Sequence, residues 1–153
     1  MDQQNDISIQ KLTTGDLPLF LELIRLFEVV FEMKDFVMPP EAHLQQLLNR
    51  EDFFVFVALA DGKVAGGLTA YTLIQYYSIK PLVYIYDLAV ANERQRRGIG
   101  RRLVHGLNEY CRRNGVEEVF VQADEVEDHA VAFYHATGGT AEKVVHFYYP
   151  LSK

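Results

Sequence analysis

The residues with the clearest chemical potential are the glycines and arginines of the stretch Arg94-Gln95-Arg96-Arg97-Gly98-Ile99-Gly100-Arg101. The apolar run from Tyr84 to Val90 precedes this stretch, and apolar residues at helical spacing follow it. The first turn of a helix leaves backbone N–H groups without intrahelical partners, and the helix dipole adds partial positive charge there. Glycines let a pyrophosphate approach the backbone, and arginines add charge and bidentate contacts. The pattern predicts a phosphate site at a strand-to-helix turn.

The glycine spacing excludes two other phosphate-binding motifs. It differs from the dinucleotide fingerprint of Rossmann folds, and no ribose-binding acid follows a second strand. A Walker loop needs Gly-Lys-Ser or Gly-Lys-Thr, and the chain contains neither tripeptide.

The elements that must position this turn can be predicted from hydrophobic periodicity and turn residues. We expect strands at residues 7–12, 53–60, 63–73, 83–90, 118–123 and 144–149, and helices at 17–31, 41–49, 98–114 and 128–137. Asp61-Gly62 predicts a hairpin turn, and Gly115 predicts the left-handed end of a helix. The order β-α-α-β-β-β-α-β-α-β predicts a single α/β domain over residues 1–153, with a mixed central sheet flanked by helices.

Composition narrows the classes of function. The chain has 153 residues, a formal net charge of −6 and one cysteine. The negative charge argues against nonspecific nucleic-acid binding. Cys111 lies on an apolar helix face and is expected to be buried, and no cluster with metal-ligand spacing predicts a metal site. A polar N-terminus and the lack of a long apolar run favour a cytoplasmic protein without a membrane span.

The motif Gln95-x-x-Gly98-x-Gly100 resembles the acetyl-CoA pyrophosphate motif of the GCN5-related N-acetyltransferases, and the predicted element order resembles their fold. The resemblance implies acetyl-CoA as cofactor, bound by the end of the preceding strand and by the turn. A backbone N–H near Leu88 or Ala89 would stabilise the oxyanion of acyl transfer. The implied cofactor-binding residues are Leu88, Ala89, Val90, Gln95, Arg96, Arg97, Gly98, Ile99, Gly100 and Arg101.

A second match lies in Ala130-Val131-Ala132-Phe133-Tyr134, followed by Gly138. In the family, a helix of this kind places a tyrosine beside the coenzyme A sulfur, so the resemblance implies that Tyr134 contacts the cofactor and protonates the departing thiolate. Spacing alone favours a core tyrosine, because Tyr134 lies at helical spacing from Ala130 and Thr137. The family often has an asparagine near the start of this helix, where this chain has Asp128-His129.

An acidic cluster predicts the acceptor. In most proteins a run such as Asp124 to Asp128 is a solvated loop, but this one follows a strand, where open α/β sheets bind ligands. Several carboxylates around a crevice would attract a small polycationic amine. The expected substrate-binding residues are Glu32, Asp35, Tyr84, Asp87, Asp124, Glu125, Asp128 and His146.

A narrower resemblance covers the C-terminal two-thirds of the chain. The runs Tyr84-Ile85-Tyr86-Asp87-Leu88-Ala89-Val90 and Val121-Gln122-Ala123-Asp124, the helix from Asp128 to Tyr134, and His146-Phe147 resemble the aminoglycoside 3-N-acetyltransferases. The resemblance implies direct transfer of acetyl to a 3-amine in a ternary complex. Asp124 is the first choice for the base that takes the amine proton, Asp87 the second and Tyr84 the third.

Two alternatives remain open at this stage. The acceptor could be a polyamine, another small amine or a protein N-terminus. In a different class, the chain could be a noncatalytic acyl-CoA-binding sensor. The aromatic run Phe147-Tyr148-Tyr149 could also form the edge of a homodimer.

Overall fold

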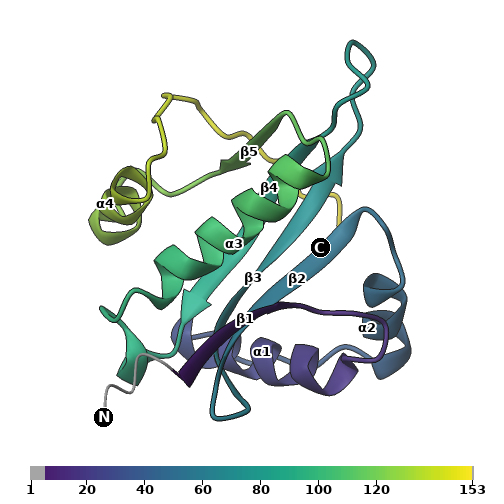
Figure 1. Cartoon of the computed structure of the whole chain (residues 1–153), viewed down its shortest axis with the longest axis vertical. Coiled ribbons are helices and arrows are strands. Elements are labelled where there is room, and N and C mark those ends of the chain that lie inside the picture. Colours follow the sequence, from purple (N-terminus) through teal and green to yellow (C-terminus); the bar gives the residue numbers. More distant parts are fainter. Residues whose placement is uncertain (1–5, 153) are drawn as a thin grey trace. The chain divides into compact units, whose positions relative to one another are not determined.

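The computed structural model describes residues 6–152, which divide into two compact units, Met1–Gln122 and Ala123–Lys153. The first unit holds a five-stranded sheet in the order β1-β2-β3-β4-β5 (Figure 1). Its first four strands pair antiparallel, and β4 and β5 pair parallel. The strands are β1 (Ile7–Lys11), β2 (Phe53–Ala60), β3 (Lys63–Leu73), β4 (Leu82–Val90) and β5 (Glu118–Val121).

Helices of the first unit pack on both faces of this sheet. The helices are α1 (Leu17–Val30), α2 (Glu41–Leu48) and α3 (Ile99–Arg113), with a short 3₁₀ turn, η2, at Asn92–Arg94. Leu103 and Leu107 of α3 are buried against one face, together with Cys111, which confirms the predicted burial of the thiol. Phe20, Leu23 and Phe27 of α1 and Leu44 of α2 are buried against the other face. Figure 1 shows α3 crossing the sheet on one side and α1 on the other.

Most predicted elements of the first unit are confirmed to within a residue or two, although β5 ends at Val121 rather than residue 123. Asp61 and Gly62 both have positive φ, at 52° and 78°, as a type I′ hairpin turn requires. Gly115 has φ 73° just past the end of α3. The mixed sheet with its parallel β4–β5 pair is also as predicted.

The second unit contains α4 (Asp128–Ala136), and Gly138 follows that helix with φ 98°. The strand predicted over residues 144–149 is wrong: these residues have no regular secondary structure, and their side chains are exposed. The segment is rich in residues that favour strands, but a strand forms only where a neighbour takes up its backbone hydrogen bonds. The terminal β of the predicted order is therefore absent from the described residues.

Two consecutive glycines let β3 approach its neighbours. A Cβ on Gly67 would lie 2.6 Å from Leu23 Cδ1 and 2.7 Å from the Phe56 carbonyl O, and one on Gly66 would lie 2.9 Å from the Ala89 carbonyl O. These distances are shorter than normal van der Waals contact distances. Gly67 therefore allows α1 to pack directly against β3.

We predict that Gly67→Ala lowers the free energy of unfolding by about 1–3 kcal/mol, because the new methyl group overpacks a contact that includes backbone. Urea denaturation followed by circular dichroism measures the change. Gly15→Ala is the matched control, because a Cβ there meets nothing within 4 Å, and it should change stability by less than about 0.5 kcal/mol. Equal midpoints for the two variants would contradict the packing argument.

Candidate active site

The end of β4 is open on one side. Along its whole length β4 pairs with β3, from Leu82↔Leu73 to Val90↔Gly66. Its pairing with β5 covers only four residues and ends at Ile85↔Val121. Beyond Ile85, no described strand pairs with this edge of β4. The edge of residues 86–90 therefore lies open to another extended chain, and the cofactor-binding role expected of Leu88, Ala89 and Val90 stays a prediction.

The turn after β4 has the geometry of an anion site. Gly98 has φ 79° and Arg96 has φ 64°, so the chain is left-handed at two positions just before α3. The first i→i−4 hydrogen bond of α3 runs from the Arg102 N–H to the Gly98 carbonyl O, at 3.1 Å. The N–H groups of residues 99–101 thus precede the helical ladder. Nothing lies within 4 Å of a Cβ built on Gly98, so the backbone is accessible there.

Gln95 has a structural role at this turn. Its Nε2 donates to the Val90 carbonyl O at 3.1 Å and to Asn92 Oδ1 at 3.3 Å. The side chain thereby fastens the end of β4 to the turn that follows. Gln95 thus stabilises the shape of this loop, and its expected cofactor-binding role stays a prediction.

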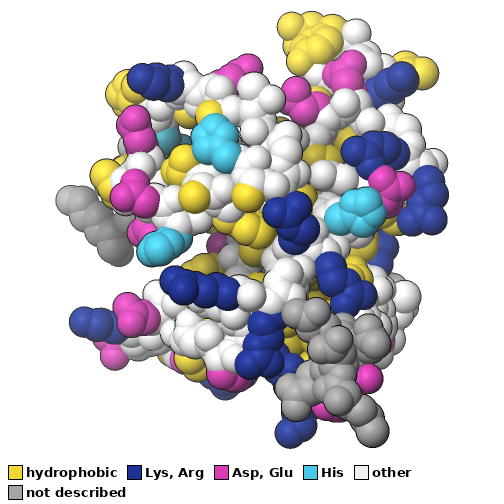
Figure 2. Space-filling model, turned by 60° about the vertical axis from the view of Figure 1, so that its left-hand side comes forward, with side chains coloured by type: hydrophobic (Ala, Val, Ile, Leu, Met, Phe, Trp, Pro, Cys, Tyr) yellow, Lys and Arg dark blue, Asp and Glu magenta, His cyan; other side chains and the backbone are white. Residues whose placement is uncertain are grey.

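Basic side chains around the turn carry uncompensated charge. None of the ion pairs between described residues involves Arg94, Arg96, Arg97, Arg101 or Arg102. Figure 2 shows a band of lysine and arginine side chains across the middle of one face of the molecule. The arginines of the turn are therefore available to a phosphate group.

Asp87 and Tyr84 lie together on the sheet face covered by α1 and α2. Asp87 is half-buried, and burial raises the pKa of its carboxyl above the ordinary value. Burial also raises the pKa of Tyr84, with smaller contributions from Tyr86 and Asp87. The Tyr84 hydroxyl donates to Gln122 Oε1 at 3.1 Å. At neutral pH, Tyr84 is therefore a neutral phenol and a poor base.

Glu32 and Asp35 lie in the loop after α1, and both are exposed. Both adopt positive φ, at 50° and 57°. Non-glycine residues in this region are uncommon and cluster at functional sites. The expected substrate-binding role of this loop stays a prediction.

The second unit contains the remaining residues that the sequence predicts for catalysis and substrate binding. Asp124, Glu125 and Asp128 form an exposed loop before and at the start of α4. The Asp124 carbonyl O accepts from the Glu127 N–H at 2.9 Å, which shapes this loop. Tyr134 is half-buried on α4, with its ring centroid 5.1 Å from that of Phe133. His146 lies in the extended segment, 6.3 Å from the Tyr148 ring.

Tyr71 and Tyr86 are residues of this site that sequence reasoning missed. Their ring centroids lie 5.7 Å apart, and Tyr86 lies 6.0 Å from Tyr84. The pairing of β3 with β4 brings Tyr71 close to Asp87, and this pairing cannot be read from the sequence. The only available signal was tyrosine at alternate positions 84 and 86, which indicates a shared face.

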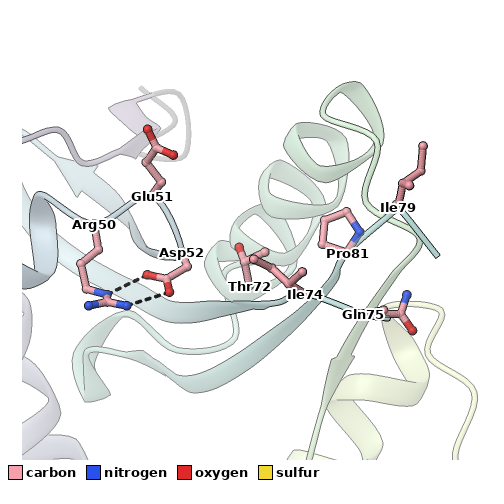
Figure 3. A pocket seen from close by; sticks show the side chains of 8 residues that line it. All are labelled: Arg50, Glu51, Asp52, Thr72, Ile74, Gln75, Ile79 and Pro81. Carbon is pink, nitrogen blue, oxygen red and sulfur yellow. Dashed lines mark hydrogen bonds and ion pairs between the residues drawn. The ribbon is translucent and has the colours of Figure 1, made fainter. Parts of the chain in front are cut away.

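A separate hollow of about 640 Å³ lies where β2 begins, β3 ends and β4 begins. Figure 3 shows Arg50 and Asp52 at its wall, joined by two hydrogen bonds of 2.7 and 2.8 Å. It lies at the opposite end of β4 from the glycine turn, and its lining includes none of the expected site residues. The lining residues are Arg50, Glu51, Asp52, Thr72, Ile74, Gln75, Ile79 and Pro81.

Within residues 6–152, no three His, Cys, Asp or Glu side chains are arranged to hold a metal ion. No helix in that part of the chain has the length and apolar character needed to cross a membrane. Burial raises the pKa of Cys111 to about 11, so its thiol is not a nucleophile at neutral pH.

The sheet order, the open strand end and the glycine turn define an acyl-CoA-dependent transferase fold. A profile of the acetyltransferase (GNAT) family matches residues 20–138. The chain belongs to this family, whose members use acetyl-CoA as the acetyl donor. A comparison with curated proteins gave no match.

Several solved structures are similar to this chain over nearly its whole length. One is the aminoglycoside acetyltransferase meta-AAC0020, from an uncultured soil metagenomic sample, in complex with sisomicin. Its sequence is 54% identical to this chain, and the two structures match with a TM-score of 0.97 over 99% of this chain and 100% of that one. Its complex with trehalose is 56% identical, with a TM-score of 0.95 over 97% and 98%. The aminoglycoside acetyltransferase HMB0005, also from an uncultured soil metagenomic sample, is 33% identical, with a TM-score of 0.90 over 95% and 99%.

We predict that Asp87→Asn stabilises the free protein at pH 7. The raised pKa means that folding favours the protonated acid, so stability is lost as pH rises from the unfolded pKa, about 4, through the folded pKa. The amide avoids this loss, and the difference between variant and parent should vanish at lower pH. Urea denaturation between pH 3.5 and 8 measures it. Asp61→Asn, in an exposed turn, is the control and should change stability by less than about 0.5 kcal/mol. A constant difference at every pH would contradict the burial argument.

Proposed function

We propose that this acetyltransferase moves an acetyl group to the 3-amine of an aminoglycoside antibiotic, by direct transfer in a ternary complex, and so confers resistance. The observation that carries the proposal is a relative 54% identical over nearly the whole chain that was solved with sisomicin. The half-buried Asp87 beside three tyrosines supports it, because such a surface suits a cationic amine. We further propose that residues 1–153 act as one domain.

The residues of the open strand and the glycine turn fit the cofactor. The backbone of residues 86–90 would pair with the pantetheine arm, and the α3 N-terminus with its arginines would hold the pyrophosphate. When bound, acetyl-CoA supplies an activated acyl group. A backbone N–H at Leu88 or Ala89 would donate a hydrogen bond to the acyl oxygen.

Two side chains would handle protons. An ammonium group must lose a proton before it attacks, yet carboxylates that bind it raise its pKa. We propose that Asp124 accepts this proton, directly or through water, while the other carboxylates hold ammonium groups that do not react. Tyr134 would donate its phenolic proton to the departing thiolate.

The decisive experiment is thiol release from acetyl-CoA with gentamicin, sisomicin, kanamycin, spermidine and short peptides as acceptors. We expect turnover with gentamicin and sisomicin, with acetyl located on the 3-amine by mass spectrometry and NMR. Asp124→Asn should lower kcat about 100-fold or more and leave acetyl-CoA affinity unchanged. Acetyl on another amine would overturn the regiospecificity, and turnover with spermidine or peptides alone would overturn the aminoglycoside proposal. Acetyl-CoA binding without turnover would favour a sensor.

We predict that Gly98→Val lowers acetyl-CoA affinity at least 10-fold, because a branched side chain at φ 79° strains the turn and covers its backbone. Gly115→Val is a matched control, since Gly115 lies at the other end of α3 with φ 73° and open space around it. Isothermal titration calorimetry should show normal affinity for the control despite a similar loss of stability. Equal losses of affinity would mean that strain in α3, rather than the turn, is responsible.

We also propose that two copies pair through the exposed segment 144–149. Phe147, Tyr148 and Tyr149 are each more than three-quarters exposed, and large apolar patches mark interaction surfaces. Sedimentation of the full chain as a monomer at micromolar concentration would refute this pairing.

A further inference from the structure

Aromatic rings form a continuous row across four strands of the sheet. The row starts at Phe53 of β2, which is buried against Phe20 with centroids 6.0 Å apart. It continues through Tyr71 of β3, Tyr86 and Tyr84 of β4, and Phe120 of β5. The successive centroid distances are 5.1, 5.7, 6.0 and 4.8 Å. The row is anchored in the core at Phe53 and exposes ring surface at Tyr71 and Tyr86.

A β-bulge brings Asp87 to this row. In the β3–β4 register, Thr69 pairs with Asp87 and Ala70 with Ile85, so Tyr86 is the extra residue. In a regular strand, neighbouring residues point to opposite faces. Here Tyr86 contacts Tyr71 and Tyr84, while Asp87, opposite Thr69, influences the same two tyrosines electrostatically. The bulge therefore places Tyr86 and Asp87, which are neighbours in sequence, on one face.

The Asp87 carboxylate has no partner of its own. Between described residues, no hydrogen bond or ion pair reaches it, although it is half-buried. A half-buried carboxylate without a partner is costly, and an arriving cation removes that cost. Burial raises the pKa of Tyr71 and Tyr84, so these two phenols stay neutral at pH 7 and carry no charge that competes with Asp87.

We propose that Tyr71, Tyr84 and Tyr86, together with Asp87, form an ammonium-binding tyrosine platform that determines acceptor specificity. The proposal rests on the proposed function, because it names how that site selects its amine. Ring faces attract a cation within about 6 Å, and aromatic cages are a known way of binding alkylammonium groups. Tyr86 is 60% exposed and Tyr71 is 38% exposed, so both rings can be reached from solvent.

The platform is well placed for direct transfer. Its residues lie on the face covered by α1 and α2, whereas α3 covers the other face. Tyr86 is also the first residue of β4 beyond its pairing with β5. An amine held on the platform from one face would thus lie beside the open strand edge, which the pantetheine arm would reach from the turn before α3.

The test measures sisomicin binding and acetylation by Tyr86→Leu, Tyr86→Phe and Tyr77→Leu. We expect Tyr86→Leu to raise Kd and KM for sisomicin about 10-fold with kcat within about 3-fold, as the loss of a cation–π contact implies. Tyr86→Phe keeps the ring and should stay within about 2-fold of the parent. Tyr77 is the exposure-matched control, 69% exposed in the β3–β4 loop, away from the row.

Neutral and simple cationic probes separate the explanations. Calorimetry with trehalose, an uncharged sugar, should show a smaller loss for Tyr86→Leu than sisomicin does, and equal losses would overturn the role of charge. Unchanged sisomicin affinity in Tyr86→Leu, with the parent active, would overturn the platform and leave the proposed function standing. If the parent acetylates no aminoglycoside, spermidine becomes the probe. Weaker spermidine binding by Tyr86→Leu would then support the platform alone, and unchanged or undetectable binding would reject it.

Discussion

The structure depends on one unsatisfied edge: β4 has a hydrogen-bonded neighbour on both sides for only its first four residues. Backbone donors and acceptors normally find partners, and an open edge inside a sheet is a liability that proteins manage. Here the opening lies directly before the glycine turn, so the open edge of β4 leads along the chain to the N-terminus of α3. An extended molecule with amides at one end and phosphates at the other satisfies both. The opening is therefore the feature on which the proposed coenzyme A site depends.

In the same strand, one extra residue changes which side chains face the core and which face the opposite side of the sheet. Val83 and Ile85 face the α3 core before the bulge, and Leu88 and Val90 pack against that core after it. Without the extra residue at Tyr86, the apolar positions of one half would point into the acceptor face. The bulge keeps the core intact and leaves Tyr84, Tyr86 and Asp87 together on the opposite face. One irregularity thus preserves the core and brings together the residues of the proposed platform.

Sequence reasoning succeeded where local chemistry decides the structure. The Asp61-Gly62 turn, the left-handed Gly115 after α3 and the burial of Cys111 each follow from one or two residues and their neighbours. It failed where the outcome depends on a partner strand. Val144 to Tyr149 has the composition of a strand but lacks a neighbour in the described residues, and Tyr71 reaches Asp87 only through the register of β3 with β4. The packing role of Gly67 was not predicted, because its tight contact is with Leu23, which is distant in sequence.

Asp87 illustrates a conflict between stability and function. A half-buried carboxylate with no partner weakens the free protein, and replacing it with a neutral residue would remove that penalty. The penalty is useful if the acceptor is a cation, because a bound ammonium restores the missing interaction and the gain appears as affinity. The tyrosine rings favour a charged sugar over a neutral one only through cation–π attraction. The carboxylate adds further discrimination between them, so a residue that is costly to the free protein would also explain a polycationic acceptor.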